Sequence, residues 1–465
     1  MVSEERFEFT ATAKKRLIIT LMVGLVLSVL GYFTLGSGDH GGGHGEDHSE
    51  VVADGHGEEP YGSEDSSTNL EEDASSSNRT TPAKEGHGDE EHHGSSSSVK
   101  RLLSNLWINN VFFAGLAIIG VFFFAIQYAS QAGWATGIKR IPMAFGNWLP
   151  IAFVLMLVVF MIGGHDLFHW THADLYAENG GDEIVKGKAP YFFWPLEGGA
   201  FPIFWIGRLV IFFAVWYLLF RKLRALAYSE DIEGGTTQWY KMRKISAIFL
   251  VFFAVSSSMA AWDWIMSIDV HWFSTMFGWY AFASWWVAGL ALTLFIVVML
   301  KDKGYLSVVN ENHIHDLGKF VFAFSIFWTY IWFSQFLLIY YAHIPEETVY
   351  FLERWKDDHY APVFYINLIL NFFFPFLVLM TRDAKRHTRI LKVVCPAVVF
   401  GHWLDFYMMV SPGTVGDNGG FGFLEIGLIL VYLSAFLYVT YNSLSKAPLF
   451  AKNHPMLKES LHHHI

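Results

Sequence analysis

Long runs of apolar residues, separated by short polar segments, dominate the pattern of this chain. A helix of about 20 mainly apolar residues crosses the core of a bilayer, so each run of that length predicts a membrane span. Ten runs qualify: 17–36, 103–128, 147–167, 201–221, 245–267, 273–300, 320–343, 361–381, 390–411 and 421–444. The pattern predicts an all-α polytopic membrane protein with ten transmembrane helices, and Trp, Tyr and Pro near the run ends are typical of the membrane interface.

Basic residues alternate from loop to loop, and this alternation predicts the orientation of the spans. Every second loop (139–140, 221–244, 301–319 and 382–392) is basic, as are both termini, whereas the other loops are acidic or neutral. Because Lys and Arg accumulate in cytoplasmic loops, we predict that the N- and C-termini are cytoplasmic. The first run is too long for the apolar part of a signal peptide, so we expect a retained span.

The composition excludes several classes of protein. Hydrophobic residues make up 53% of the 465 positions and charged residues only 16%, well below the roughly 25% that is usual for soluble domains. The net charge of −11 excludes a strongly basic nucleic-acid binder. With Cys395 as the single cysteine, the chain cannot form an internal disulfide, a Cys-ligated iron–sulfur cluster or a covalent CxxCH haem. We therefore expect no covalently bound cofactor.

An acidic insert follows the first span. Residues 38–99 hold sixteen acidic, two basic and seven His residues in a Gly- and Ser-rich context. Such a segment cannot bury enough apolar surface to fold alone, so we predict a disordered periplasmic insert over 38–100. His40, His44 and His48 recur every fourth residue, but the glycines between them oppose the helix that would align them on a metal.

A faint internal repeat predicts how the helices are grouped. Spans five and nine each carry a Trp close to an Asp in the same half of the membrane, at Trp262–Asp263 and Trp403–Asp405. An offset of four spans predicts two four-helix bundles related about the membrane normal, with two peripheral helices. The expected parts are 1–37 (N-terminus and first span), 38–100 (insert), 101–270 (spans two to five), 271–412 (spans six to nine) and 413–465 (tenth helix and cytoplasmic tail).

A histidine group ends the third span. His165, Asp166, His169 and His172 follow one another closely, and the His spacing of four and then three predicts a single helical face. Three interpretations remain open at this stage: a polar cap at the membrane interface, a proton acceptor facing a quinone, or a haem or metal ligand. We expect no metal site.

Other ionisable residues lie inside the predicted spans, where each needs a partner or a polar cavity. Arg208 is too deep for a loop charge and is expected to pair with Asp166 or Asp263. The remaining candidates for a proton pathway or a quinone-facing site share a position in the outer half of the membrane: Asp263, Asp269, His271, His402, Asp405 and Glu425. We favour one shared polar cavity over separate helix-packing pairs.

Two stretches of the chain resemble a known family. HDLFHWTHADLYAENGGDEIVKGKAPYFFW (165–194) and AWDWIMSIDVHWFSTMFGWYAFA (261–283) are similar to the ActF-type membrane subunits of bacterial alternative complex III, which belong to the NrfD/PsrC-like family. The resemblance covers nearly all of the chain after about residue 100, and the insert lies outside it.

The resemblance implies a function and a set of partners. It implies a multi-pass subunit of a quinol:cytochrome c oxidoreductase in the bacterial inner membrane, with no activity of its own when isolated. Expected partners are membrane lipid, a second NrfD/PsrC-like subunit (ActC), multihaem and monohaem cytochromes c and an iron–sulfur subunit; a haem-copper terminal oxidase is a further candidate. Haem and iron–sulfur clusters would then lie in the partner subunits. Whether this chain binds a menaquinone or quinol stays open, as does a proton pathway.

Two alternatives from other classes remain. The chain could be the quinone-binding anchor of another NrfD/PsrC-type oxidoreductase, which its partner subunits would distinguish. It could also be a secondary transporter or channel, although no pair of spans has the Gly- or Pro-broken pattern that is typical of a midplane transport site.

Overall fold

The computed structural model describes residues 5–38 and 96–464, and this part of the chain is helical with no β-strand. Ten of its helices are long and apolar enough to cross a membrane, which confirms the all-α polytopic membrane fold. Most of the acidic insert lies outside the described residues, so its predicted disorder stays a prediction.

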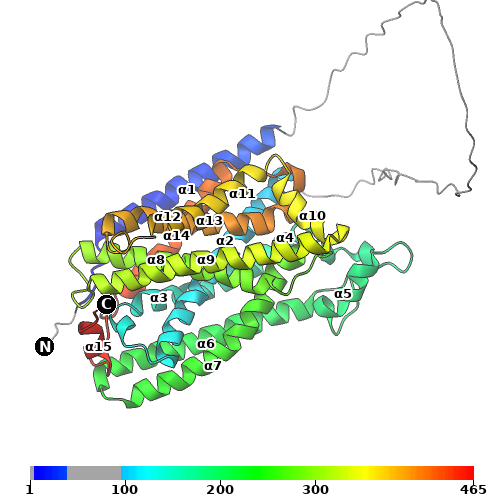
Figure 1. Cartoon of the computed structure of the whole chain (residues 1–465). Helices are drawn as coiled ribbons and strands as arrows, with labels where there is room; N and C mark the ends of the chain where they lie inside the picture. Colours follow the sequence, from blue (N-terminus) through cyan, green and yellow to red (C-terminus); the bar gives the residue numbers. More distant parts are fainter. Residues whose placement is uncertain (1–4, 39–95, 465) are drawn as a thin grey trace, which may run out of the picture.

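The ten membrane helices follow the predicted runs in order (Figure 1). They are α1 (Ala11–Gly38), α2 (Ser97–Ala129), α4 (Leu149–Leu167), α6 (Ile203–Glu233), α7 (Thr237–Trp264), α8 (Phe277–Asp302), α9 (Glu311–Ala342), the α11–α12 unit, α13 (Thr388–Val415) and α14 (Phe423–Leu444). Three shorter helices lie between them: α3 (Arg140–Phe145), α5 (Glu183–Phe193) and α10 (Pro345–Trp355). A fourth, α15 (Leu457–Leu461), follows α14.

The eighth span is not one regular helix. It consists of α11 (Ala361–Leu368), a π-helical turn η6 (Ile369–Phe373) and α12 (Phe374–Val378). Pro375 lacks an N–H, and its ring would clash with the carbonyl of Asn371 in a regular α-helix, so the backbone widens before it. The run 361–381 predicted the span but not this break.

Helix α2 forms the axis of the molecule. It packs against α4, α7, α8, α13 and α14, and its side chains are buried on all faces, which agrees with a helix that is apolar all round. Helix α6 contacts both α4 and α7, and α8 contacts both α9 and α13. The division into two four-helix bundles stays a prediction, because α2 connects both groups.

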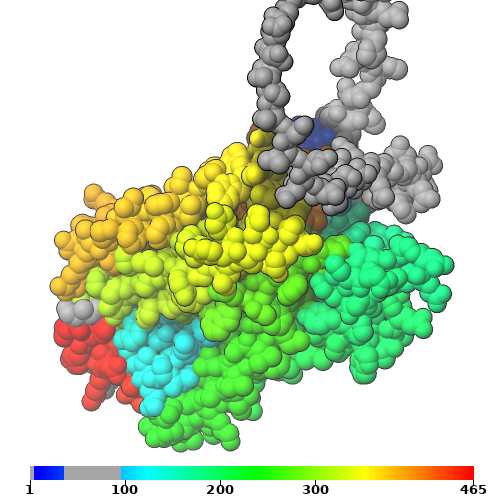
Figure 2. All heavy atoms as spheres, turned by 45° about the vertical axis from the view of Figure 1, so that its right-hand side comes forward, coloured from blue at the N-terminus to red at the C-terminus, as the bar shows by residue number. Residues whose placement is uncertain are grey.

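The two ends of the described chain meet at one end of the bundle. Arg6 forms an isolated bridge with Pro448, and Leu449 N–H donates to the Glu5 carbonyl at 2.9 Å. We call this the terminal end; α5 and α10 lie at the opposite end, the loop end (Figure 1). In Figure 2 the red C-terminal segment lies beside the cyan residues after α2, where α15 packs on the turn Trp134–Gly137.

Helix α1 lies along α14 through small residues. A Cβ on Gly31 would come within 2.3 Å of Leu424 N, and one on Gly427 within 2.4 Å of Ser28 N. Without a hydrophobic effect between helices in lipid, such close backbone contact is a main source of packing energy.

This contact predicts a stability difference between two glycines. Gly427→Ala should destabilise the protein by about 1–3 kcal/mol, because the added methyl group overpacks the α1–α14 interface. Gly207 of α6 meets no atom within 4 Å of an added Cβ, so Gly207→Ala should be neutral or slightly stabilising. Thermal unfolding in mild detergent measures both variants, and equal midpoints would contradict the described contact.

Candidate functional site

Four carboxylates predicted for the outer half of the membrane lie near the loop end, and three of them contact arginine. Asp263 is buried on α7, and Arg208 of α6 binds it through two hydrogen bonds, Nε to Oδ2 at 2.7 Å and Nη2 to Oδ1 at 2.8 Å. Arg208 Nη1 also donates to the Tyr191 carbonyl at 2.8 Å. Of the two expected partners of Arg208, Asp263 is the one that makes this ion pair. Such a bidentate pair is well suited to a structural role.

Asp269 pairs with Arg354 of α10, with 2.8 Å between Oδ2 and Nη2. Arg354 Nε also donates to the Met408 carbonyl at 2.9 Å. This carbonyl lacks its helical partner because Pro412, four residues later in α13, has no N–H. Arg354 was not among the predicted site residues; a lone arginine in the mainly acidic loop 346–358 was the available signal.

Glu425 pairs with Arg101, with 2.8 Å between Oε1 and Nε. Asn105 Nδ2 donates to the same oxygen at 2.9 Å, and the Gly422 N–H donates to Oε2 at 2.7 Å. The carboxylate therefore joins α2 to the start of α14. Arg101, also missed from the sequence, lies just before the predicted second span.

Asp405 differs from these three carboxylates. It is fully buried on α13 and accepts hydrogen bonds from Tyr280 of α8, from Trp328 Nε1 of α9 at 2.8 Å and from Asn367 Nδ2 of α11 at 3.1 Å. All of these donors are neutral, and no basic side chain in the described part of the chain forms an ion pair with Asp405. Asn371 extends the network by donating to Asn367 Oδ1 at 2.5 Å.

His402 lies one helical turn before Asp405 on the same face of α13. Its Nδ1 hydrogen-bonds to the Ser284 hydroxyl at 3.0 Å, and its ring packs edge-on against Trp328. Its Nε2 is buried and has no hydrogen-bond partner among the residues that the structure describes. We refer to His402, Asp405, Tyr280, Trp328 and Asn367 as the Asp405 cluster.

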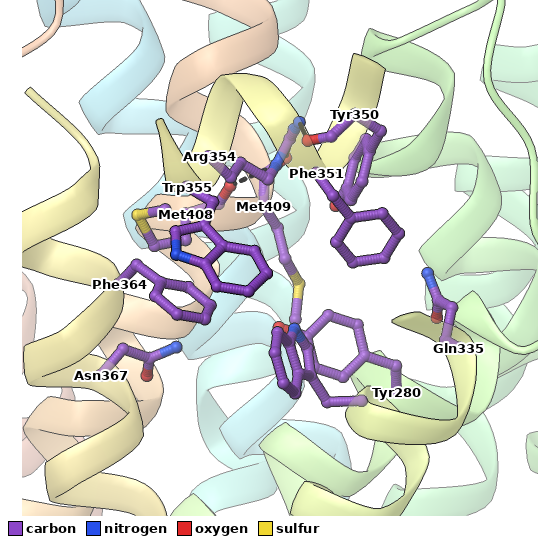
Figure 3. Close-up of a pocket in the computed structure, with 11 residues that line it drawn as sticks. Tyr280, Gln335, Tyr350, Phe351, Arg354, Trp355, Phe364, Asn367, Met408 and Met409 are labelled. Atoms are coloured by element: carbon purple, nitrogen blue, oxygen red, sulfur yellow. Dashed lines mark hydrogen bonds between the residues drawn. The ribbon is translucent and has the colours of Figure 1, made fainter. Parts of the chain in front are cut away.

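A narrow cleft of about 30 Å³, enough for about two water molecules, adjoins the Asp405 cluster (Figure 3). Tyr280 and Asn367 border it and contact Asp405, while Arg354 and Tyr350 border it from α10. Gln335 of α9 also faces it, and the buried Oε1 atom of Gln335 has no partner within the described ranges. The arrangement can hold a small polar group or pass a proton between the cleft and Asp405.

The prediction of a single shared polar cavity is therefore wrong in part. The Asp405 cluster and the Arg354 side of the Asp269 pair border the same cleft. Asp263 and Glu425 do not line it and lie in separate ion pairs. Asp263 and Glu425 are each stabilised by their own arginine, so neither contributes to a shared polar cavity.

The histidine group gathers at the surface of the loop end, but not on one helical face. Helix α4 ends at Leu167, and His169–Thr171 form a 3₁₀ turn, so the predicted continuous helix face is wrong. The rings still approach one another: their centroids are 5.5 Å apart for His165–His172, 5.7 Å for His169–His172 and 6.2 Å for His169–His271. Asp166 lies at the end of α4 beside this group.

These histidines have other partners than a metal. His165 Nδ1 hydrogen-bonds to Thr171, and His271 Nε2 lies 2.5 Å from Asp182 Oδ2. Partial burial, followed by the nearby His172 and His271, lowers the pKa of His169. No group of His, Cys, Asp and Glu residues in the described chain has the geometry to hold a metal ion. His343 is exposed at the end of α9.

The Arg208–Asp263 pair predicts a large cost for removing one partner. Asp263→Ala should destabilise the protein by about 3–5 kcal/mol, because it leaves a buried guanidinium without its counter-ion. The double variant Arg208→Met, Asp263→Leu should recover much of this loss. Glu183→Ala, which breaks the exposed pair with Lys186, is the control and should cost less than about 1 kcal/mol. Chemical unfolding in detergent measures all three.

A second prediction concerns acid pH at the loop end. The hydrogen bond with His271 lowers the pKa of Asp182 below its ordinary value of 3.8. The stabilisation is therefore complete above that value and is lost as the pH falls through the lower, folded-state pKa. Asp182→Asn keeps the oxygen that caps α5 at Ile184 N and Val185 N but removes the charge.

Hydrogen exchange of segment 173–193 tests this expectation. In the wild type, protection relative to the intrinsic exchange rate at each pH should fall only at acid pH, whereas Asp182→Asn should show the lower protection at neutral pH as well. Asp182→Ala, which also loses the cap, should exchange faster still. Equal exchange in the wild type and Asp182→Asn at neutral pH would show that the His271 contact contributes nothing.

No protein-family model matches this chain, and no curated protein is similar to it at a significant level. Membership of the NrfD/PsrC-like family therefore stays a prediction from the two stretches 165–194 and 261–283. The functional conclusion depends on those stretches together with the geometry of the Asp405 cluster.

Proposed function

We propose that this chain is an integral membrane subunit of a quinol:cytochrome c oxidoreductase of the alternative complex III type, in the bacterial inner membrane. It would scaffold the complex through its ten membrane helices and carry part of a proton pathway at the loop end. Support for the family comes from the resemblance of 165–194 and 261–283. Support for the proton pathway comes from the Asp405 cluster.

The observation that carries the proton pathway is the absence of a cationic partner at Asp405. Asp263, Asp269 and Glu425 each contact an arginine, and such pairs hold a carboxylate in one charge state. Asp405 contacts only neutral donors in the described chain. A carboxylate with exchangeable hydrogen-bond donors can gain and lose a proton without breaking an ion pair, which is the property of a proton relay.

The residues around Asp405 define a short route for this proton. The Tyr280 hydroxyl donates to Asp405 and borders the cleft. It can therefore exchange a proton with Asp405 on one side and with a group in the cleft on the other. Gln335 and Asn367 supply further polar groups in the cleft. If the termini are cytoplasmic, as predicted, the cleft faces the periplasmic side, where a quinol-oxidising complex releases protons.

A quinone-type site in the same cleft is the alternative within this function. Tyr280, Asn367 and Gln335 could hydrogen-bond to a quinone headgroup, provided that the cleft widened to admit its ring. Trp355 and Phe364, which stack on each other with ring centroids 5.8 Å apart, would have to separate for this. The same residues would serve the quinone-binding anchor of another NrfD/PsrC-type complex. The partner subunits distinguish the two complexes: multihaem cytochrome c and ActC in one, a single soluble iron–sulfur subunit in the other.

A transporter is favoured by one specific feature, the break in the eighth span. The π-helical turn at Ile369–Phe373 places Asn371 next to Asn367 near the Asp405 cluster, and broken helices are typical of transport sites. Solute or ion flux through the isolated chain in liposomes would support this candidate. If the isolated chain shows no flux, but the assembled complex releases protons during quinol oxidation, the respiratory function is supported.

Mass spectrometry of the proteins that co-purify with this chain in mild detergent tests the proposed complex. We expect a multihaem cytochrome c, a monohaem cytochrome c, an iron–sulfur protein and a second polytopic subunit in fixed proportion. Purification of the chain alone, or as a homo-oligomer, would contradict the proposal.

The Asp405 cluster predicts a selective loss of activity in that complex. Asp405→Asn keeps the shape of the side chain but removes the exchangeable proton, so coupled quinol oxidation and proton release should fall about 100-fold or more. Glu425→Gln is the matched control: it should reduce stability, because Arg101 loses its counter-ion, but leave turnover within about twofold when assembly is intact. Equal turnover in Asp405→Asn and the wild type would contradict the proton pathway.

A further inference from the structure

A groove between α4 and α6 faces outward near the terminal end of the helices. It has a volume of about 160 Å³. Only apolar or aromatic residues line it: Leu149, Pro150, Phe153, Val210, Phe213, Ala214 and Tyr217. Phe153 and Phe213 form its floor, with ring centroids 5.6 Å apart.

A guanidinium lies at the mouth of this groove. Arg221 follows Tyr217 by one helical turn of α6, and its guanidinium carbon is 5.9 Å from the Tyr217 ring centroid. The Arg221 side chain is exposed, and in the described part of the chain it has no carboxylate partner. Arg224 lies three residues after Arg221 on α6. It hydrogen-bonds to Asn147, which lies just before α4.

The surroundings of Arg221 are cationic. Lys222 follows it directly in α6 and is also exposed. The acidic residues at the end of α6 have partners elsewhere: Glu230 accepts from Tyr128, Asp231 pairs with Arg140, and Glu233 accepts from Gln238. These carboxylates therefore compensate little of the charge at the groove.

We propose that this groove binds one anionic phospholipid of the leaflet at the terminal end. An acyl chain would lie against Phe153 and Phe213, and the phosphate would contact Arg221 at the mouth. A basic group directly above an apolar groove between membrane helices has the chemistry of such a lipid. A soluble anion would contact Arg221 but would leave the apolar floor uncovered. A phospholipid would contact both the guanidinium and the apolar floor.

Native mass spectrometry of the complete purified protein tests the proposal. After delipidation, the protein is titrated separately with phosphatidylglycerol, phosphatidylcholine and inorganic phosphate. We expect one phosphatidylglycerol to bind at lower concentration than phosphatidylcholine, and inorganic phosphate not to displace it. Equal binding of the two lipids, or displacement by inorganic phosphate, would overturn the proposal.

Two variants locate the lipid in the groove. Arg221→Gln should weaken phosphatidylglycerol binding about fivefold, and Ala214→Phe should weaken it by filling the groove while the charge stays intact. Arg389→Gln is the control, since Arg389 is an exposed arginine on α13, away from α4 and α6. If Arg221→Gln and Arg389→Gln bind the lipid equally well, or Ala214→Phe binds as the wild type does, the site is not this groove.

Discussion

The cost of burying a carboxylate among membrane helices is the constraint on which the polar interior of this protein depends. Water is not available to solvate the charge, so each carboxylate requires a cation or a set of hydrogen-bond donors. Asp263 and Glu425 are bound by Arg208 and Arg101, and each pair joins two helices. These pairs explain how α6, α7, α2 and α14 are held in place near the loop end.

The same constraint distinguishes Asp405 from the carboxylates that are paired with arginine. Asp405 is as deeply buried as the others, yet its donors are a tyrosine, a tryptophan and an asparagine from three different helices. Helices α8, α9 and α11 therefore converge on α13 through a group whose charge is not fixed by an arginine. The adjoining cleft connects this group to α10, where Arg354 replaces the hydrogen bond that Pro412 cannot make.

Much of the fold could be predicted from the sequence, because run length and apolar character determine which segments can cross a membrane. The sequence also located most of the ionisable residues that lie among the membrane helices, since such a group in an apolar run is conspicuous. Their partners were harder to predict. Arg354 and Arg101 lie outside the predicted spans, and the donors to Asp405 are ordinary aromatic and amide residues on distant helices. The π-helical break at Pro375 and the end of α4 at Leu167 depend on local backbone geometry that the apolar pattern does not contain.

We propose that Asp405, and not the arginine-paired carboxylates, changes its protonation or hydrogen bonding during turnover. Infrared difference spectroscopy of the purified complex, recorded between its oxidised and quinol-reduced states, measures this change directly through the carboxyl stretching bands. We predict a carboxyl difference band in the wild type that disappears in Asp405→Asn and persists in Glu425→Gln. A band that persists in Asp405→Asn, or that disappears only in Glu425→Gln, would show that Asp405 is not the group that changes.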